Sequence, residues 1–479
     1  MSLDPAQPSA RPAPLDAIFK AYDIRGTVPD QLDPQVAYAV GHGFARHVLD
    51  VEPSDIELVL ARDMRDTGVG LALAFAAGAM AGGLGVVDLG LGSTDLLYYA
   101  SGTLGLPGAM VTASHNPAGY NGIKCCLAGA RPIGQETGLG EIKRYAAERY
   151  SNAPVDGGVG QVLGDSRYVR RDDLLGEFAR HVRSFVEVSR LAPLRVVADV
   201  ANGMGGLIVP AVFSGLPVEL EILFPELDGS FPNHPADPIQ PENLEDLRRA
   251  VLEAGADLGL AFDGDADRVF LVDEMAEPVS GSATTAMVAV SMLASHPGAT
   301  VLHNLICSKA VPEVISEHGG TAVRTRVGHS FIKSVMEETG AIFGGEHSGH
   351  YYFRENFRAD SGIIAALVVL EVLSETGLPL SVLRKRYERY ADSGEINTVV
   401  PDPGSVISKV ASVFEKEGAQ LDFLDGLTAD LGDWWFNLRP SNTEPLLRLN
   451  LEAEDAASCE RHVAEVLEVI SSSSDAKRP

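Results

Sequence analysis

Short apolar runs that end at glycine, proline or polar residues recur along most of the chain. Such runs are typical of buried strands, and the longer segments between them have the length and composition of helices. Alternation of this kind predicts parallel sheets that are covered by helices. We expect strands at 56–63, 85–90, 108–111, 194–200, 299–306, 321–327 and 341–346, and helices at 71–83, 309–320 and 329–340.

The C-terminal part of the chain has a different pattern. Strand-like stretches at 396–400, 434–438 and 446–454 precede a helical segment near 454–471, which predicts a smaller α+β domain. A length of 479 residues suits about three or four domains, although no repeat is visible in the sequence. We therefore expect an α/β fold with three similar α/β domains, which have mixed, mostly parallel sheets, and the smaller α+β domain. The expected domains are 1–164, 165–277, 278–388 and 389–479.

Composition narrows the range of partners. The formal net charge is −28, so the chain has no surplus of Lys and Arg to neutralise the phosphates of a nucleic acid. A small phosphorylated ligand needs only a few cations in one cleft and stays possible. The chain has four cysteines and no CxxC pattern, which favours a reducing cytoplasm over a disulfide framework.

One uncharged stretch has the length of a membrane span. Thr67 to Val87 contains 21 residues without a charge, but six are Gly and six are Ala, which is a poor composition for insertion. We expect a buried helix followed by a strand here, and no membrane partner. Residues 1–16 are proline-rich and lack an apolar core, so we expect a loose arm and no signal peptide.

The stretch "VTASHNPAGYNGIK", residues 111–124, begins where an expected strand ends. Ser114 is therefore expected on a loop beyond the carboxyl end of that strand, which is where open α/β sheets bind ligands. Serine there could be a nucleophile, although the same residue types also make plain turns.

A second polar loop carries three aspartates on alternate residues. Asp263, Asp265 and Asp267 lie between two apolar runs in "LGLAFDGDADRVFLVDE". Converging carboxylates repel one another unless a cation neutralises them, and oxygen-only ligands suit Mg²⁺. A calcium loop of the EF-hand type is disfavoured because Arg268 stands where that loop needs glycine. A solvated acidic turn is the remaining alternative.

Two further loops complete the set. In "GGEHSGHYYF", residues 344–353, Glu346 and Ser348 can bind hydroxyls, and the glycines at 345 and 349 would let the backbone approach a ligand. In "RPSNTEP" the donors at Arg439 and in the following loop form a set that suits a phosphate. Polar turns are the alternative for both. Together the four loops predict phosphoryl transfer on a phosphosugar, without deciding between hydrolysis, transfer and isomerisation.

Seven motifs in order resemble the landmarks of the α-D-phosphohexomutase family. They are "KAYDIRG" (20–26), "TASHNP" (112–117), "NGIK" (121–124), "DGDADR" (263–268), "VGHSFIK" (327–333), "GEHSGH" (345–350) and "RPSNTEP" (439–445). The resemblance covers nearly the whole chain. It implies four domains around one central cleft, three of them similar.

The resemblance also implies roles for individual residues. Ser114 matches the catalytic phosphoserine, and Asp263, Asp265 and Asp267 match the ligands that hold Mg²⁺ together with a phosphoserine oxygen. Arg268 would assist them. The other matches are His115, for support of the phosphoserine; Lys124, for proton transfer once its pKa is depressed; and, for substrate binding, Tyr22, Arg25, Lys309, His329, Glu346, Ser348, His350, Arg439, Ser441, Asn442 and Thr443.

The implied activity interconverts hexose 1-phosphate and hexose 6-phosphate through a hexose 1,6-bisphosphate, which is both intermediate and activator. "GEHSGH" favours the phosphomannomutase/phosphoglucomutase branch, although Met often stands at the position of His347, which leaves the choice between mannose and glucose open. Phosphoglucosamine mutase is the alternative enzyme, and an inactive phosphosugar-binding scaffold is the alternative of another class. We expect a cytoplasmic monomer or weak homodimer.

Two segments depart from the family pattern, "ARDMRDTG" (61–68) and "RADSG" (358–362). We expect neither of them to touch the catalytic residues.

Overall fold

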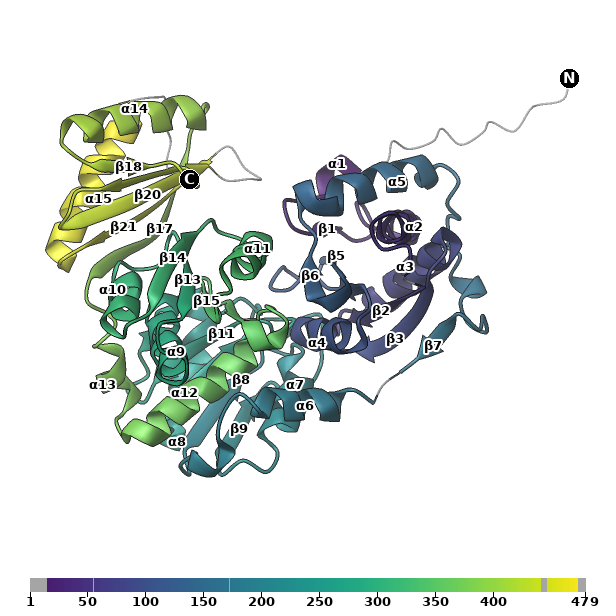
Figure 1. The fold of residues 1–479 in the computed structure, drawn as a ribbon, viewed down its shortest axis with the longest axis horizontal. Helices are drawn as coiled ribbons and strands as arrows, with labels where there is room; N and C mark the ends of the chain where they lie inside the picture. The colour runs from purple at the N-terminus through teal and green to yellow at the C-terminus, as the bar shows by residue number, and fades with distance from the viewer. Residues whose placement is uncertain (1–14, 55, 172, 441–445, 473–479) are drawn as a thin grey trace, which may run out of the picture.

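Four β-sheets follow one another along the chain, each built from one continuous stretch of sequence (Figure 1). The computed structural model describes residues 15–54, 56–171, 173–440 and 446–472. Three sheets combine parallel and antiparallel pairs, and the fourth is antiparallel throughout. The expected fold class, three α/β units and a smaller α+β unit, is confirmed.

The first sheet has the order β1-β5-β4-β2-β3-β7, with β6 paired to β5. Strands β4, β2, β3 and β7 are parallel, and β1 and β5 run antiparallel to their neighbours. β7 lies beyond position 164, so this sheet extends past the expected end of the first domain. The elements are α1 (Leu15–Ile18), β1 (Ile24–Thr27), α2 (Pro34–Val51), β2 (Glu57–Arg62), α3 (Gly68–Gly82), β3 (Gly85–Leu91), α4 (Thr94–Leu104), β4 (Gly108–Val111), β5 (Tyr120–Leu127), β6 (Arg131–Pro132), α5 (Gly140–Tyr150) and β7 (Tyr168–Arg170).

The second and third sheets have the orders β12-β11-β10-β8-β9 and β14-β13-β15-β16. In each, parallel strands are extended by an antiparallel hairpin, β10–β11 or β15–β16. The elements of the second unit are α6 (Leu175–Arg183), β8 (Arg195–Asp199), α7 (Gly205–Phe213), β9 (Glu219–Leu223), α8 (Glu245–Ala254), β10 (Leu258–Phe262), β11 (Val269–Asp273) and β12 (Pro278–Val279). Those of the third are α9 (Gly281–Ser295), β13 (Thr300–Asn304), α10 (Ala310–Glu317), β14 (Thr321–Thr325), α11 (His329–Thr339), β15 (Phe343–Gly345), β16 (Tyr351–Phe353), α12 (Gly362–Thr376) and α13 (Leu380–Arg384).

The fourth sheet has the order β17-β21-β20-β19-β18 and carries two helices. Figure 1 shows this unit at the upper left, next to the third unit and across the molecule from the first. Its elements are β17 (Ala391–Val399), α14 (Pro403–Lys416), β18 (Gln420–Asp422), β19 (Leu427–Asp430), β20 (Trp434–Pro440), β21 (Leu446–Ala453) and α15 (Ala456–Ser471).

The uncharged stretch from Thr67 to Val87 forms helix α3 and the start of strand β3, as expected. α3 packs on α2 with backbone against backbone: a Cβ at Gly78 would lie 1.9 Å from the carbonyl oxygen of Tyr38. This close approach requires small residues, which explains the Gly and Ala content. Among the described residues, no helix combines the length and the apolar character needed to cross a membrane.

The hydrophobic cores divide the molecule unevenly. One continuous cluster joins the second and third sheets to the α4 side of the first, and includes Leu97, Val196, Val301 and Leu367. The fourth sheet has a core of its own between Val400 and Ile470. The first three units are therefore held together by apolar packing, which the fourth does not share.

Candidate active site

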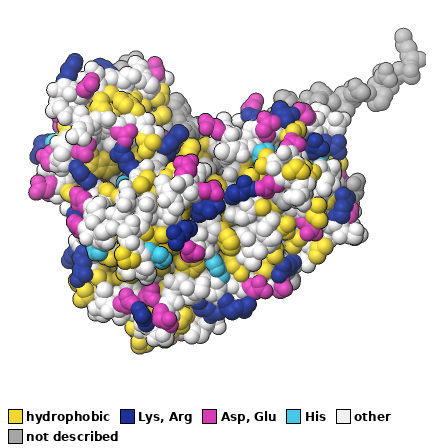
Figure 2. Space-filling model, viewed as in Figure 1, with side chains coloured by type: hydrophobic (Ala, Val, Ile, Leu, Met, Phe, Trp, Pro, Cys, Tyr) yellow, Lys and Arg dark blue, Asp and Glu magenta, His cyan; other side chains and the backbone are white. Residues whose placement is uncertain are grey.

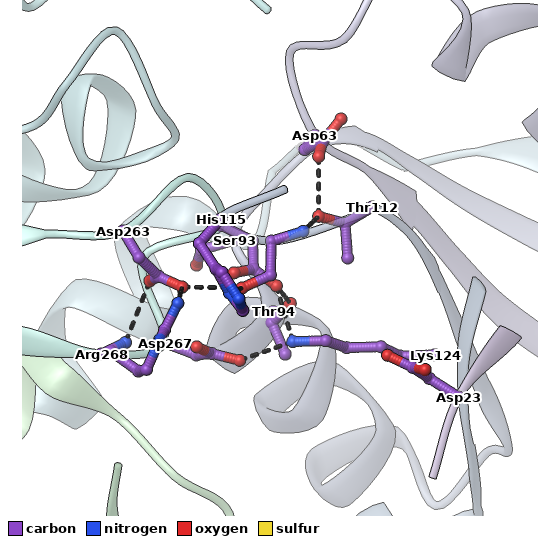
Figure 3. Close-up of polar contacts among 12 residues, drawn as sticks. Asp23, Asp63, Ser93, Thr94, Thr112, His115, Lys124, Asp263, Asp267 and Arg268 are labelled. Atoms are coloured by element: carbon purple, nitrogen blue, oxygen red, sulfur yellow. Dashed lines mark hydrogen bonds and ion pairs between the residues drawn. The ribbon is translucent and has the colours of Figure 1, made fainter. Parts of the chain in front are cut away.

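Ser114 lies on the loop after β4, where the sequence placed it, and its side chain contacts the second unit. Figure 3 shows the surrounding residues, with His115 next to Asp263 and Arg268 of the second unit. Its Oγ donates to Asp263 Oδ2 at 2.7 Å and lies 3.2 Å from His115 Nδ1. The residue has a φ of 49°, in the left-handed region that non-glycine residues seldom adopt. A serine hydroxyl is thus held, in an uncommon backbone conformation, against a carboxylate of a different domain.

The three aspartates lie in the turn of the β10–β11 hairpin and are buried. One oxygen from each lies within 4.8 Å of the others. Lys124 Nζ bridges Asp265 Oδ2 at 2.7 Å and Asp267 Oδ2 at 2.6 Å, and the Arg268 guanidinium contacts Asp263 Oδ2 at 2.9 Å. The predicted convergence of carboxylates is confirmed, and the flanking strands exclude an EF-hand.

Burial and charge set the protonation of the cluster. Burial raises the pKa of Asp263 to about 7, against the charge of Arg268. Although burial alone would raise the pKa of Asp265, the charge and hydrogen bond of Lys124 hold it below the usual value. Burial opposes the charged form of Lys124, but Asp265 and Asp267 raise its pKa well above the usual value. The condition under which Lys124 could act as a base, a depressed pKa, is therefore not met in this arrangement, in which the side chain is an ammonium.

The acidic cluster could hold a divalent cation. Asp265 Oδ1 and Asp267 Oδ1 are buried and have no hydrogen-bond partner among the residues that the structure describes. Unpaired buried carboxylate oxygens are costly, and hard cations prefer oxygen ligands of this kind. The donor set therefore fits a metal ion, and Lys124 shows that a positive charge is accommodated between two of the carboxylates.

His115 and Arg25 lie beside the serine. Burial, together with the charges of Arg268 and Arg25, lowers the pKa of His115 well below the usual value, so the imidazole is neutral. Arg25 Nη1 donates to Asn116 Oδ1 at 2.5 Å on the same loop. Tyr22 reaches further, because its hydroxyl donates to the carbonyl of Val327 at 3.0 Å and so connects the first unit to the third.

The third unit reaches the acidic cluster through His350. Its Nδ1 lies 2.8 Å from Asp360 Oδ2 and 3.8 Å from Asp267 Oδ1, and its backbone pairs with Arg268. Asp360 also lies 3.3 Å from Lys333 Nζ. Segment 358–362 therefore contacts a predicted substrate-binding residue, because Asp360 binds His350 directly.

The other residues of this hairpin are held by the protein. Glu346 is buried and accepts hydrogen bonds from Asn304 Nδ2 at 3.0 Å and the Tyr352 hydroxyl at 2.6 Å, and Ser348 lies half-buried in the turn. A Cβ at position 345 would meet Thr285, and one at position 349 would meet Phe270. These two glycines therefore serve packing within the protein, where we had expected room for a ligand.

The phosphate-binding residues predicted in the fourth unit are only partly described. Arg439 is the penultimate residue of β20, and its Nη2 lies 2.9 Å from Glu395, which Arg448 also contacts at 2.9 Å. Ser441, Asn442 and Thr443 lie outside the described residues. Lys309 joins the third unit to the fourth, with Nζ 3.2 Å from Asp430. His329 begins helix α11.

The molecular surface is hollowed between the fourth unit, at the upper left of Figure 2, and the first, at the upper right. Lys and Arg side chains gather below this hollow in the middle of the face shown, although the chain as a whole is strongly acidic. A local concentration of positive charge of this kind suits a small phosphorylated ligand.

Comparison with known families accounts for all four units. Residues 16–152, 176–276 and 280–390 match the α/β/α domains I, II and III of phosphoglucomutase/phosphomannomutase, and residues 395–469 match its C-terminal domain. The chain belongs to the phosphoglucomutase/phosphomannomutase family. The resemblance drawn from the seven motifs is thereby confirmed.

Relatives in this family align along nearly the whole chain. A phosphomannomutase of Salmonella montevideo is 38% identical over 462 residues, which cover 95% of this chain and 99% of the relative. Phosphohexose mutases of Xanthomonas campestris are 40% identical over 451 residues, covering 94% and 98%. A solved structure of a family protein from Burkholderia thailandensis superposes with a TM-score of 0.83 at 29% identity, covering 96% of this chain and 98% of that one.

Two residues of this chain, Thr94 and Arg65, contact the site although the sequence analysis did not predict them. Thr94, at the start of α4, donates from Oγ1 to Asp265 Oδ2 at 2.5 Å, and its backbone N–H donates to the Asp265 carbonyl at 3.1 Å. It follows the carboxyl end of β3, so the same rule that located Ser114 could have found it. Arg65 donates from Nη2 to the Ser114 carbonyl at 2.9 Å. Segment 61–68 therefore touches the site, contrary to expectation.

Proposed function

We propose that the protein is a phosphomannomutase, with phosphoglucomutase activity as well, that interconverts hexose 1-phosphate and hexose 6-phosphate. The observation that carries the proposal is the 2.7 Å contact between Ser114 Oγ and Asp263, which joins a nucleophile of domain I to the acidic loop of domain II. Phosphoryl transfer needs these two components together. The relatives named as phosphomannomutases, 38% and 39% identical to this chain, support the choice of mannose.

In the first half of the reaction, phosphorylated Ser114 is the donor. The sugar hydroxyl oxygen attacks the phosphorus, the bond from phosphorus to Oγ breaks, and the proton of the sugar hydroxyl ends on Oγ, so that a hexose 1,6-bisphosphate and a free serine hydroxyl result. In the proposal, Arg268, which binds Asp263 at 2.9 Å, stabilises the charge on the transferred group. The Lys124 ammonium, which binds Asp265 at 2.7 Å, passes the proton to the departing serine oxygen. The second half reverses these roles after the bisphosphate has turned in the cleft.

Asp263, Asp265 and Asp267 would hold Mg²⁺ together with an oxygen of the phosphorylated serine. The chemistry that the bound ion supplies is neutralisation of the charge on the transferring phosphoryl group. His115, as a neutral imidazole beside Oγ, orients the serine.

The far end of the cleft would recognise the sugar and its second phosphate. In the proposal, Glu346 and Ser348 bind ring hydroxyls in both orientations of the sugar, and Arg439 with Ser441, Asn442 and Thr443 binds the phosphate that does not react. Tyr22, Arg25, Lys309, His329 and His350 are the residues proposed to bind the substrate between the two ends. Glu346 is pre-oriented by two side chains, which suits a role in orientation.

The alternatives have less support. An inactive scaffold would not need a serine held at 2.7 Å from one of three converging carboxylates. The phosphoglucosamine alternative has only remote support: an N-acetylphosphoglucosamine mutase of Aspergillus fumigatus superposes with a TM-score of 0.62 at 14% identity, which indicates the fold alone. The four buried free cysteines are compatible with a cytoplasmic location, and monomer or weak homodimer stays a prediction.

A ³¹P NMR time course tests the proposed function. The protein is mixed with Mg²⁺, a trace of glucose 1,6-bisphosphate and one of three substrates: mannose 1-phosphate, glucose 1-phosphate or glucosamine 1-phosphate. Conversion of the first two to 6-phosphates without inorganic phosphate is the expected result. Conversion of glucosamine 1-phosphate alone would identify the protein as a phosphoglucosamine mutase. If no substrate reacted, the inactive phosphosugar-binding scaffold would be the remaining alternative.

A further inference from the structure

Arg65 is one of the most deeply buried side chains of the molecule, with 2% of its surface exposed. It follows β2, the strand next to β4 in the first sheet. Its Nε donates to Asp63 Oδ2 at 3.2 Å. The remaining donors go to backbone carbonyls: Nη1 to Pro117 at 2.9 Å and Tyr120 at 3.0 Å, and Nη2 to Ser114 at 2.9 Å and Asn116 at 2.6 Å.

An arginine has five N–H donors in a fixed planar fork, and here all five are used. Four of them bind carbonyls of one loop, residues 114–120, that carries the nucleophile. A lysine has three donors on a single atom and cannot reproduce this planar pattern. The loop therefore depends on the shape of the guanidinium as well as on its charge.

Asp63 adds a second support to the same loop. Its Oδ2 also accepts from Thr112 Oγ1 at 2.6 Å, and Thr112 Oγ1 accepts from the Ser114 backbone N–H at 2.9 Å. Both the N–H and the carbonyl of Ser114 are thus held through the pair formed by Asp63 and Arg65. Ser114 has a left-handed backbone, which is unfavourable for a non-glycine residue and needs support of this kind.

Domain II closes over this assembly. The ring of Phe231 lies 5.0 Å from the guanidinium carbon of Arg65, and a Cβ at Gly229 would come within 2.6 Å of Arg65 Cα. On the other side, a Cβ at Gly264 in the acidic loop would lie 2.5 Å from the Ser114 carbonyl oxygen. Arg65 therefore sits where the serine loop of domain I meets two segments of domain II.

We propose that Arg65 is a positioning residue that locks loop 114–120, and so keeps Ser114 Oγ at the acidic loop in both phosphoryl transfers. The inference rests on the proposed function. Arg65 contacts Ser114 only through the backbone carbonyl and takes no part in bond making. Its loss misplaces the nucleophile, so kcat falls while KM for the hexose phosphate changes little.

The test compares Arg65→Lys and Arg65→Ala with Arg384→Lys and Arg384→Ala. Arg384 is a matched control, because it also binds a carboxylate, Asp273 at 3.2 Å, and a backbone carbonyl, that of Pro278 at 2.5 Å, but has no contact with loop 114–120 among the described residues. For each variant we would measure kcat, KM, the melting temperature, and amide hydrogen exchange in peptides that cover 112–120. Guanidinium ion is added to Arg65→Ala.

We expect kcat of Arg65→Lys to fall about a hundredfold with KM within about threefold of wild type. We also expect faster exchange in 112–120 alone and partial rescue of Arg65→Ala by guanidinium. If Arg65→Lys had the kcat and the amide exchange of the wild type, the inference would be overturned. It would also be overturned if the Arg384 variants, at the same melting temperature as the Arg65 variants, lost as much kcat. If the wild-type protein were inactive while residues 112–120 exchanged faster in Arg65→Lys, the proposed function would be rejected and the support of the loop by Arg65 would stand.

Discussion

The junction of domains I and II and the junction of domains III and IV are built differently. At the first, Ser114, the acidic loop and Arg65 are buried and linked by hydrogen bonds, and apolar packing continues behind them. At the second, Lys309 and Asp430 pair while partly exposed, and the fourth domain has its own core. The groups proposed to react therefore lie in a buried hydrogen-bonded network, whereas the groups proposed to hold the distant phosphate sit on a domain that has a separate hydrophobic core.

This difference suits a substrate that must turn around between two transfers. A fixed transfer site keeps the nucleophile in place through both steps, and a separately packed domain can release and rebind a phosphate. If this interpretation is correct, substitutions at the first junction lower kcat, and substitutions at the second mainly raise KM.

The largest effect is expected for Ser114→Ala, which removes the atom that is proposed to carry the phosphoryl group. Turnover should fall by roughly 10⁶-fold, the scale of loss when a covalent nucleophile is deleted. The ³¹P NMR assay measures this, with circular dichroism as the control for folding. Near-full activity would remove Ser114 from the mechanism.

Asp265→Asn tests the acidic loop. The variant loses one carboxylate charge beside Lys124 and Thr94, and we expect kcat to fall about 10²- to 10³-fold, with much weaker dependence on Mg²⁺ concentration. Titration of the rate with Mg²⁺ provides the measurement. A metal response like that of wild type would place the cation elsewhere.

Arg439→Ala tests the opposite end of the cleft. Loss of a charge-assisted hydrogen bond costs about 1.5–3 kcal/mol, so KM for mannose 1-phosphate should rise about 10- to 100-fold while kcat changes less. Arg448→Ala is the matched control, since Arg448 shares Glu395 with Arg439. A fall in kcat without a change in KM would contradict the division of roles between the two junctions.

The smallest effect is expected for Lys309→Met, which removes the ion pair with Asp430 between domains III and IV. Partly exposed pairs contribute about 0–1 kcal/mol, so we expect KM to rise at most about fivefold. The effect should shrink at high salt, because salt screens exposed charges. Steady-state kinetics at low and high KCl would measure it, and a difference between variant and wild type that persists at high KCl would assign Lys309 a direct contact with substrate.

The sequence predicted what depends on local pattern. The strand at 108–111 has the bounds expected, and both Ser114 and the three aspartates lie on loops at strand ends, because turn residues and apolar runs determine these positions locally. The closing helix begins at Ala456, close to the expected start.

Contacts between segments that are distant in the sequence could not be predicted. Arg65 is 49 residues from Ser114, and Asp95, whose carboxylate accepts from Ser361 Oγ at 2.8 Å, is 266 residues from that serine. The charge of Lys124 also depends on partners in another domain. Residue spacing along the chain does not show which loops meet in the fold. The pKa of Lys124 and the contacts of segment 61–68 could therefore be seen only in the structure.

The contact between α2 and α3 has a consequence for reading hydropathy profiles. The interval from Thr67 to Val87 resembles a bilayer-spanning segment by length, yet Gly41 and Gly78 face carbonyl oxygens of the partner helix that leave no space for a side chain. Its small, uncharged residues are explained by the short distance between α2 and α3, not by contact with lipid. Length and absence of charge alone do not separate such tightly apposed helices from a membrane span, whereas residue volume along the same window distinguishes the two cases.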